Sequence, residues 1–207
     1  MSTGPRRTRE AAMAVARELT AELKDACEPE RFRFAGSLRR LSESVGDIEM
    51  VYVPRIETRP DPEDLLGNPI PVNLVNIILD RWLKEGRMTR RVGPEGGTAW
   101  GEKNKLAVHT ASGIGLDLFA TDEKCFFSLL VCRTGPKEFN TRVCVRAIEL
   151  FEKWNPYRGF EDRMTGALRF QPRSEEELFA HLGWEYLEPH KRSLTPTRLR
   201  LVSHQAK

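Results

Sequence analysis

The chain has little of what a metal–thiolate site, a disulfide framework or a membrane span requires. Its four cysteines and four histidines are scattered, and no two cysteines have C-x-x-C spacing, so a zinc site is not indicated. The longest apolar-rich run, Phe126 to Cys132, is far too short to cross a bilayer, and the N-terminus lacks the features of a secretory signal. We therefore expect a soluble, cytoplasmic protein without a membrane partner, whose thiols are reduced and mostly buried.

The composition is that of a globular protein with one substantial domain or two small ones. Among 207 residues, 40% are hydrophobic and 30% are charged. The net charge of +3 is compatible with nucleic-acid binding but does not require it. The distribution says more, because no acidic residue follows Glu188 while several basic ones do. The acidic segments Glu57 to Asp64 and Glu175 to Glu177 are expected to be solvated surface.

One stretch, residues 35–53, organises the chain. Gly36 and Ser37 form a turn, and Gly46 later leads into Asp47 and Glu49 at the start of an apolar strand. Side chains two apart in a strand share a face, so both carboxylates project together. They repel each other and ionise together only beside a cation, and oxygen ligands favour Mg²⁺ or Mn²⁺. The glycine–serine turn offers backbone N–H groups and a hydroxyl to a phosphate.

A second strand, Ile114 to Phe119, carries another carboxylate. Ile114, Leu116 and Leu118 alternate toward the core, which places Asp117 on the opposite face. Alone, this aspartate would be an accident of solvent exposure. Together with the first pair it predicts a third metal ligand, and the whole pattern indicates nucleotidyl transfer.

Hydrophobic periodicity predicts the remaining elements. Helices are expected over Thr8 to Cys27, Val72 to Lys84, Glu138 to Trp154 and Glu175 to Gly183, and strands over Arg31 to Phe34, Thr89 to Val92, Trp100 to Val108 and Phe126 to Val131. In the second helix, Leu74, Ile77, Ile78 and Trp82 are predicted to point inward. The proline-rich segment from Pro54 to Val72 is expected to be a surface loop.

These motifs, in this order, resemble those of family X DNA polymerases within the polymerase beta nucleotidyltransferase superfamily. The residues that carry the resemblance are Gly36-Ser37, Arg40, Gly46-Asp47-x-Glu49, Leu116-Asp117-Leu118-Phe119, Thr134-Gly135, Phe139-Asn140, Leu182-Gly183-Trp184, Tyr186 and Pro189. The resemblance implies an α+β fold. It comprises a nucleotidyltransferase palm over residues 1–133, with a mixed sheet and helices on one side, and a small thumb-like α/β subdomain over 134–192 for nucleotide selection. A basic tail, 193–207, follows.

The resemblance also implies roles for individual residues. Asp47, Glu49 and Asp117 would bind two Mg²⁺ ions, with Mn²⁺ as a substitute. The nucleotide would contact Gly36, Ser37, Arg40, Gly46, Thr134, Gly135 and Asn140. For Arg39 an exposed ion pair is the simpler interpretation, and that alternative also stands for Arg40.

Three departures from the family pattern affect which residue roles carry over from the family to this chain. Glu49 stands where many members have aspartate. Cys132 and Arg133 replace two aromatic residues that often exclude ribose, and Lys137 replaces an acidic residue.

Contacts to DNA are less specified. The alternative for each candidate is an ordinary solvated surface. The candidates are six basic residues: Lys103, Lys105, Arg142, Arg146, Lys191 and Arg192. The expected partners are a dNTP and gapped or primer-template DNA, bound by a monomer.

The leading hypothesis is a small template-directed, gap-filling repair-type DNA polymerase that uses two-metal-ion phosphoryl transfer. One alternative is a nucleotidyltransferase acting on a small molecule, an RNA end or a protein. Another is a DNA-end-binding module whose catalysis has decayed.

Overall fold

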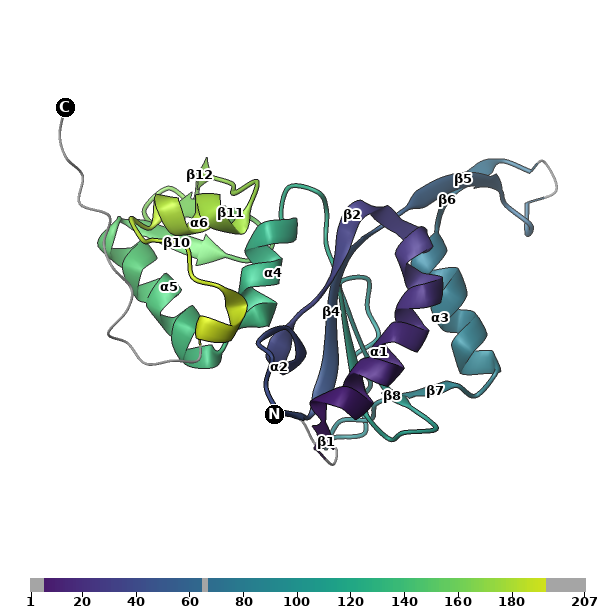
Figure 1. Cartoon of the computed structure of the whole chain (residues 1–207). Coiled ribbons are helices and arrows are strands. Elements are labelled where there is room, and N and C mark those ends of the chain that lie inside the picture. The colour runs from purple at the N-terminus through teal and green to yellow at the C-terminus, as the bar shows by residue number, and fades with distance from the viewer. Residues whose placement is uncertain (1–5, 65–66, 193–207) are drawn as a thin grey trace.

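A five-stranded mixed sheet forms the centre of the larger part of the protein (Figure 1). The computed structural model describes residues 6–64 and 67–192. The strands, in spatial order, are β2 (Cys27–Phe34), β4 (Asp47–Pro54), β9 (Gly115–Ala120), β8 (Asn104–His109) and β7 (Met88–Arg90). β4 and β9 are parallel, and the other neighbouring pairs are antiparallel. Helices α1 (Arg9–Leu23) and α3 (Leu74–Lys84) pack on one face, which confirms the α+β fold class.

The alternation of β4 separates the core from the opposite face of the sheet. Ile48 and Met50 are fully buried in the core formed with α1 and α3. Val51 belongs to a different cluster, on the face covered by α4 (Phe126–Thr134). Side chains two apart share a face, so Asp47 and Glu49 lie on the same face as Val51. The apolar pattern that builds the core thus also orients the two carboxylates away from α1 and α3.

The first helix has the pattern expected from the sequence. Thr8 is its N-cap and accepts a hydrogen bond from the backbone N–H of Ala11 at 3.3 Å, which satisfies one of the free donors at the helix start. Its buried side chains recur at helical spacing: Ala12, Ala16, Leu19 and Leu23. A short 3-10 helix, η1 (Lys24–Ala26), connects it to β2.

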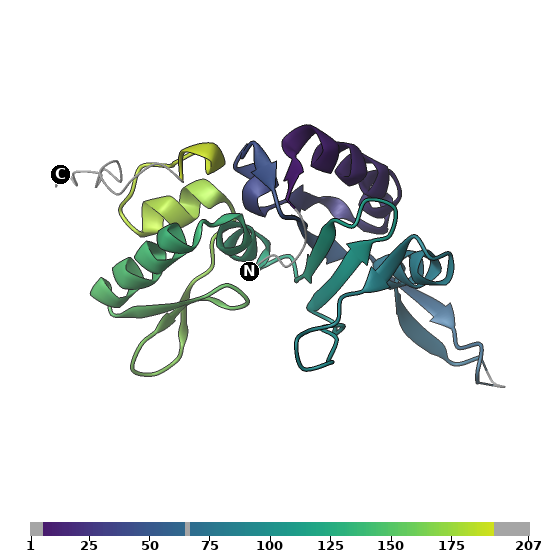
Figure 2. The same cartoon turned by 90° about the horizontal axis from the view of Figure 1, so that it is seen from below.

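The smaller part has its own core, and Figure 2 shows it beside the larger one. It contains α5 (Lys137–Glu149), α6 (Glu175–His181) and an antiparallel sheet of β10 (Glu152–Asn155), β11 (Gly159–Asp162) and β12 (Leu168–Phe170). α4 belongs to both cores, because Leu129 and Leu130 pack on the large sheet while Val131 packs in the small core. The predicted boundary between residues 133 and 134 falls in the last turn of this helix.

The expected surface loop after β4 is instead a β-hairpin that extends from the large sheet (Figure 1). β5 (Ile56–Pro60) pairs antiparallel with β6 (Pro69–Asn73). Each strand has only one neighbour, so a proline that lacks an N–H is tolerated on the outer edge. The short elements that complete the fold are β1 (Arg7–Thr8), which pairs with β3 (Ser44–Val45), α2 (Gly36–Arg39) and η2 (Pro189–Lys191).

Two further predictions were wrong in type or extent. The run predicted as a strand from Phe126 to Val131 is the helix α4, because a short run buried on several sides has no period that distinguishes the two structures. The helix predicted as far as Trp154 ends at Glu149. Trp154 lies on β10, whereas Phe151 adopts a positive φ of 59° and is 72% exposed.

The predicted inward face of α3 is also shifted. Val75, Leu79 and Trp82 are buried, whereas Ile77 is 43% exposed. Asn73 caps the helix by accepting a hydrogen bond from the N–H of Asn76 at 3.2 Å, which fixes the start of the helical turn. No helix among the described residues is long and apolar enough to cross a membrane.

Candidate active site

Three carboxylates meet on one face of the central strand pair. In the parallel register of β4 and β9, Glu49 is the partner of Asp117, and Asp47 is the partner of Gly115. Asp47, Glu49 and Asp117 are all half-buried. The structure therefore brings together the three acidic residues predicted from the sequence, although they come from strands about 70 positions apart.

The environment disfavours ionisation of two of these groups. Burial, followed by the charges of Asp47 and Asp117, raises the pKa of Glu49 to about 8. Arg133 and Arg40 act in the opposite direction but do not compensate. Burial is also the main cause of the raised pKa of Asp117. A cation placed among these oxygens would favour the charged carboxylates. Clustered carboxylates that need such a cation are typical of a divalent metal site.

An arginine from the edge of the sheet partly supplies such a charge. Arg91, which directly follows β7, places its Nη2 atom 2.8 Å from Oδ1 of Asp117. The absence of a side chain at Gly115 makes room for it, since a Cβ there would lie only 3.1 Å from Nη1 of Arg91. Sequence reasoning missed Arg91. The available signal was a glycine inside a strand, which often marks close approach of another group.

A second arginine near the carboxylates, Arg133, was also missed by sequence reasoning. The Cζ atom of Arg133 is 3.7 Å from the centroid of the Phe119 ring, and its charge opposes, without cancelling, the rise that burial causes in the pKa of Glu49 and of Asp117. Its Nε atom is buried without a hydrogen-bond partner among the described residues. Arg133 is thus close enough to the carboxylates for its charge to act on them. It occupies one of the two positions at which family X members often have aromatic residues.

The glycine–serine turn lies directly against Glu49. Gly36 begins α2 with a positive φ of 56°, and a Cβ at this position would lie 1.5 Å from Oε2 of Glu49. The backbone also connects the two segments, because the N–H of Ala35 donates to the carbonyl of Glu49 at 2.8 Å. Ser37 is half-buried in the same turn, and Gly46 is buried just before β4. The predicted phosphate-binding turn and the predicted metal ligand therefore share one small space.

Arg40 connects this turn to the C-terminal end of α4. Its Nη1 atom donates to the carbonyl of Thr134 and would lie 3.4 Å from a Cβ at Gly135. Burial is the largest cause of the lowered pKa of Arg40. Asn140 lies close by, donating from Nδ2 to the carbonyl of Cys132 at 2.7 Å. The structure thus places Arg40, Thr134 and Gly135 together, with Asn140 beside the same helix.

The neighbouring Arg39 forms a different connection, to α6. Its Nη1 and Nη2 atoms lie 2.9 and 2.6 Å from the two oxygens of Glu175, and Nη1 also donates to the hydroxyl of Thr134 at 2.7 Å. Arg192 completes the group, with Nη1 3.0 Å from Glu175. The expected solvated surface at Glu175 is therefore wrong, because this residue is only 5% exposed. The exposed ion pair expected for Arg39 is a partly buried link between the two parts of the protein.

Two residues predicted to bind DNA do not fit that role. Lys105 is 5% exposed, and its Nζ donates to the carbonyl of Gly101 at 2.8 Å. The guanidinium of Arg192 is buried against Glu175 and the rings of Phe139, Phe179 and Tyr186. The ammonium of Lys105 is held by a backbone carbonyl, and the guanidinium of Arg192 by a carboxylate and three rings, so neither is free to contact DNA.

The other predicted DNA contacts are more accessible. Lys103 and Lys191 are exposed, and Arg142 is half-buried. Arg146 donates to the carbonyl of Leu182 at 2.9 Å and pairs with Glu149. The predicted basic tail lies outside the described residues.

The donor set suits a hard divalent cation, since it consists of carboxylate oxygens that repel one another. In the described part of the chain, no three His, Cys, Asp or Glu side chains are arranged as a finished metal site. The carboxylate of Asp117 pairs with Arg91, and that of Glu49 lies against Gly36. The three carboxylates predicted as ligands lie on one face of the sheet, and two of them contact other protein groups.

Comparison with protein families finds a similarity in the smaller part of the chain. Residues 129–193 match the family model of the DNA polymerase beta thumb. This match supports a relationship to the polymerase beta-like enzymes of family X, and it suggests a function of the DNA polymerase or nucleotidyltransferase kind. Such a thumb is a DNA-binding module, which is consistent with DNA as a partner. No match was found among curated proteins.

Proposed function

We propose that this chain is a nucleotidyltransferase, and specifically a small gap-filling DNA polymerase of family X type that copies a template. The observation that carries this proposal is the shared face of Asp47, Glu49 and Asp117 beside the turn at Gly36. The thumb match supports DNA as the acceptor. Neither the carboxylates nor the turn lies within the matched segment, so the two arguments are independent.

In this proposal Asp47, Glu49 and Asp117 hold Mg²⁺, with Mn²⁺ as a substitute. When bound, two such ions supply charge neutralisation for the attacking hydroxyl and for the transferred phosphoryl group. Raised carboxyl pKa values fit this role, because a divalent cation relieves the repulsion that produces them. Arg91 would leave Asp117 when the metal is bound.

The remaining residues position the nucleotide. The turn at Gly36 leaves room for the Glu49 carboxylate, and the hydroxyl of Ser37 and the guanidinium of Arg40 would contribute donors to a phosphate. Arg39 and Arg40 contact Thr134 and Gly135, and these contacts hold the thumb beside the same turn. Asn140 would approach the base. The buried link through Glu175 holds the thumb in place while these groups act.

Removal of Arg91 tests its role as a stand-in for the metal. We expect Arg91→Gln to lower the free energy of unfolding by about 2 kcal/mol in the absence of divalent ions, because Asp117 loses its counter-charge. Mg²⁺ should then stabilise the variant more than it stabilises the unaltered protein. Urea unfolding with and without Mg²⁺ measures both effects.

Arg90→Gln is the matched control, since Arg90 stacks on Trp100 with its Cζ atom 4.9 Å from the ring centroid. If Mg²⁺ stabilises Arg91→Gln no more than it stabilises Arg90→Gln, Arg91 does not substitute for the metal.

The proposed reaction is tested by incorporation of labelled deoxynucleotides opposite a one-nucleotide gap in the presence of Mg²⁺. We expect extension to follow the template base. Parallel reactions use single-stranded DNA, RNA ends, small hydroxyl acceptors and protein acceptors. Transfer to one of these in place of gapped DNA would indicate a different nucleotidyltransferase. Gapped DNA that binds without extension, with no transfer to any other acceptor, contradicts the proposal.

A further inference from the structure

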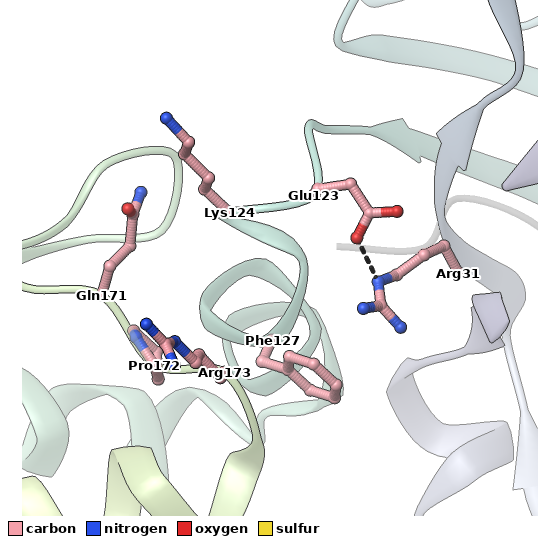
Figure 3. A pocket seen from close by; sticks show the side chains of 7 residues that line it. All are labelled: Arg31, Glu123, Lys124, Phe127, Gln171, Pro172 and Arg173. Atoms are coloured by element: carbon pink, nitrogen blue, oxygen red, sulfur yellow. Dashed lines mark hydrogen bonds and ion pairs between the residues drawn. The ribbon is translucent and has the colours of Figure 1, made fainter. Parts of the chain in front are cut away.

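One hollow between the two parts of the protein is basic. Figure 3 shows the cationic side chains that line it, Arg31, Lys124 and Arg173. A larger hollow, of about 540 Å³, lies at the ends of β4 and β9 and has the opposite charge. Tyr157, from the turn between β10 and β11, lines it together with residues of the larger part, so both parts of the protein contribute to it.

The larger hollow is separate from the candidate active site. Pro54 and Ala120, the last residues of the two parallel strands, line it. In open sheets, ligands often bind outside this end of parallel strands. Glu49 lies five residues before Pro54 on β4, which is about 16 Å at about 3.3 Å per residue. None of the three predicted catalytic carboxylates lines the hollow.

Negative charge prevails in this hollow. Glu102 and Asp122 contribute two carboxylates against the one ammonium of Lys103, so the lining has a formal charge of −1 although the chain carries +3. Oδ1 of Asp122 accepts a hydrogen bond from the backbone N–H of Cys125 at 2.8 Å, which fixes this carboxylate. Among the described residues, neither carboxylate forms an ion pair. The hollow therefore repels phosphate groups and attracts a cation.

The cation already present is bound to an aromatic ring. Nζ of Lys103 lies 4.9 Å from the centroid of the Tyr157 ring, a distance at which the ring attracts a positive charge. The hydroxyl of Tyr157 donates to Oδ1 of Asn104 at 3.0 Å, and its backbone N–H donates to Oδ1 of Asn155 at 3.0 Å, so the ring is held in place. Lys103 is thus directed to the ring, and both carboxylates remain available to a second cation.

Asn76 contributes a polar group without a partner. Its backbone N–H donates to Oδ1 of Asn73 at 3.2 Å, which is part of the cap of α3. Its side-chain Oδ1 atom is buried and accepts no hydrogen bond among the described residues. An unpaired carbonyl costs free energy, and a donor that meets it through rotation of the amide relieves that cost. The lining thus favours a ligand that carries hydrogen-bond donors as well as positive charge.

We propose that this hollow binds a small organic cation, namely a protonated amine on a short hydrocarbon chain. The ammonium supplies positive charge to Glu102 and Asp122, and its N–H groups supply donors to the amide of Asn76. Ile56, which is 53% exposed, and Pro71 offer an apolar wall to the hydrocarbon chain. The volume lies within the range of about 300–1,000 Å³ that small-molecule sites have. This site goes beyond nucleotidyl transfer and does not depend on it.

Binding is tested by calorimetric titration of the full chain, at constant ionic strength, with butylamine and with butanol as the neutral comparison. Butylamine is protonated at pH 7, because an alkylamine titrates near the pKa of lysine, about 10.4. We expect Glu102→Gln and Asp122→Asn each to weaken its binding about fivefold. Lys103→Gln should strengthen it several-fold, because a like charge is removed. Glu123→Gln is the matched control, since Glu123 adjoins Asp122 but lines the basic hollow.

The variants should leave the melting temperature nearly unchanged, because Glu102, Lys103 and Asp122 are exposed. Butylamine that binds where butanol does not, with the expected order of the variants, supports the site. Butylamine that fails to bind, or that binds no better than butanol, overturns the proposal. An equal loss of binding in Asp122→Asn and Glu123→Gln also overturns it, because the amine then binds exposed carboxylates in general.

Discussion

Gly36→Ala is expected to reduce nucleotide incorporation by about a hundredfold or more. The new Cβ would lie 1.5 Å from Oε2 of Glu49 and 2.6 Å from its Cδ atom, so this carboxylate must move. A displacement of about 1 Å in a reacting group can cost about a hundredfold in rate. The φ of +56° adds a backbone cost of about 1–2 kcal/mol for an L-residue. Single-turnover incorporation on gapped DNA, together with urea unfolding, measures both consequences.

Gly86→Ala separates the two effects. Gly86 also has a positive φ, of 70°, but no heavy atom lies within 4 Å of a Cβ at that position. This variant should lose a similar amount of backbone stability and retain full activity. If Gly36→Ala is no less active than Gly86→Ala, the space above Gly36 is not part of the reaction centre.

Glu175→Gln is expected to lower the free energy of unfolding by about 3–5 kcal/mol at pH 7, because it leaves Arg39 and Arg192 buried without a counter-charge. Both guanidinium groups currently contact the same carboxylate, which is 5% exposed. Urea unfolding measures the loss. Glu176→Gln is the matched control, since Glu176 is exposed on the same helix, and it should change stability by less than about 0.5 kcal/mol. A loss in Glu175→Gln no greater than in this control would show that the link contributes little.

The same carboxylate predicts how stability depends on pH. Burial opposes the ionisation of Glu175, but the hydrogen bonds and charges of Arg39 and Arg192 outweigh it and hold its pKa below the ordinary value. A group with a lowered folded pKa stabilises the fold above its unfolded pKa of about 4.3. That contribution is lost as the pH falls through the folded pKa. Unfolding measured from pH 6 down to pH 3 should therefore show less acid sensitivity in Glu175→Gln than in the unaltered protein.

The candidate carboxylates were predictable because the signal is local. Alternation within β4 and β9 determines which face each side chain occupies, and this pattern is complete within six or eight residues. The same locality made α1 predictable, because its apolar residues recur at helical spacing. Glu49 and Asp117 are direct partners because two distant strands pair in parallel. Neither strand's own sequence specifies this pairing.

The remaining features depend on tertiary contacts that local patterns do not encode. Arg91 reaches Asp117 only because β7, β8 and β9 are neighbours in one sheet. Glu175 looks like solvated surface in a run of three glutamates, and it is buried because Arg39 and Arg192 approach from other elements. The helix α4 was mistaken for a strand because two cores bury it on several sides.

We propose that Asp47 and Asp117 carry out nucleotidyl transfer, and gap-filling by Asp47→Asn and Asp117→Asn tests this role. Asp80→Asn serves as control, because Asp80 is exposed on α3. Each measurement is paired with binding of the same gapped DNA. We predict that both active-site variants bind the DNA and lose incorporation by about a thousandfold or more, equivalent to about 4 kcal/mol in the barrier, while the control keeps its rate. Incorporation at the unaltered rate by either Asp47→Asn or Asp117→Asn would show that the altered residue is not catalytic.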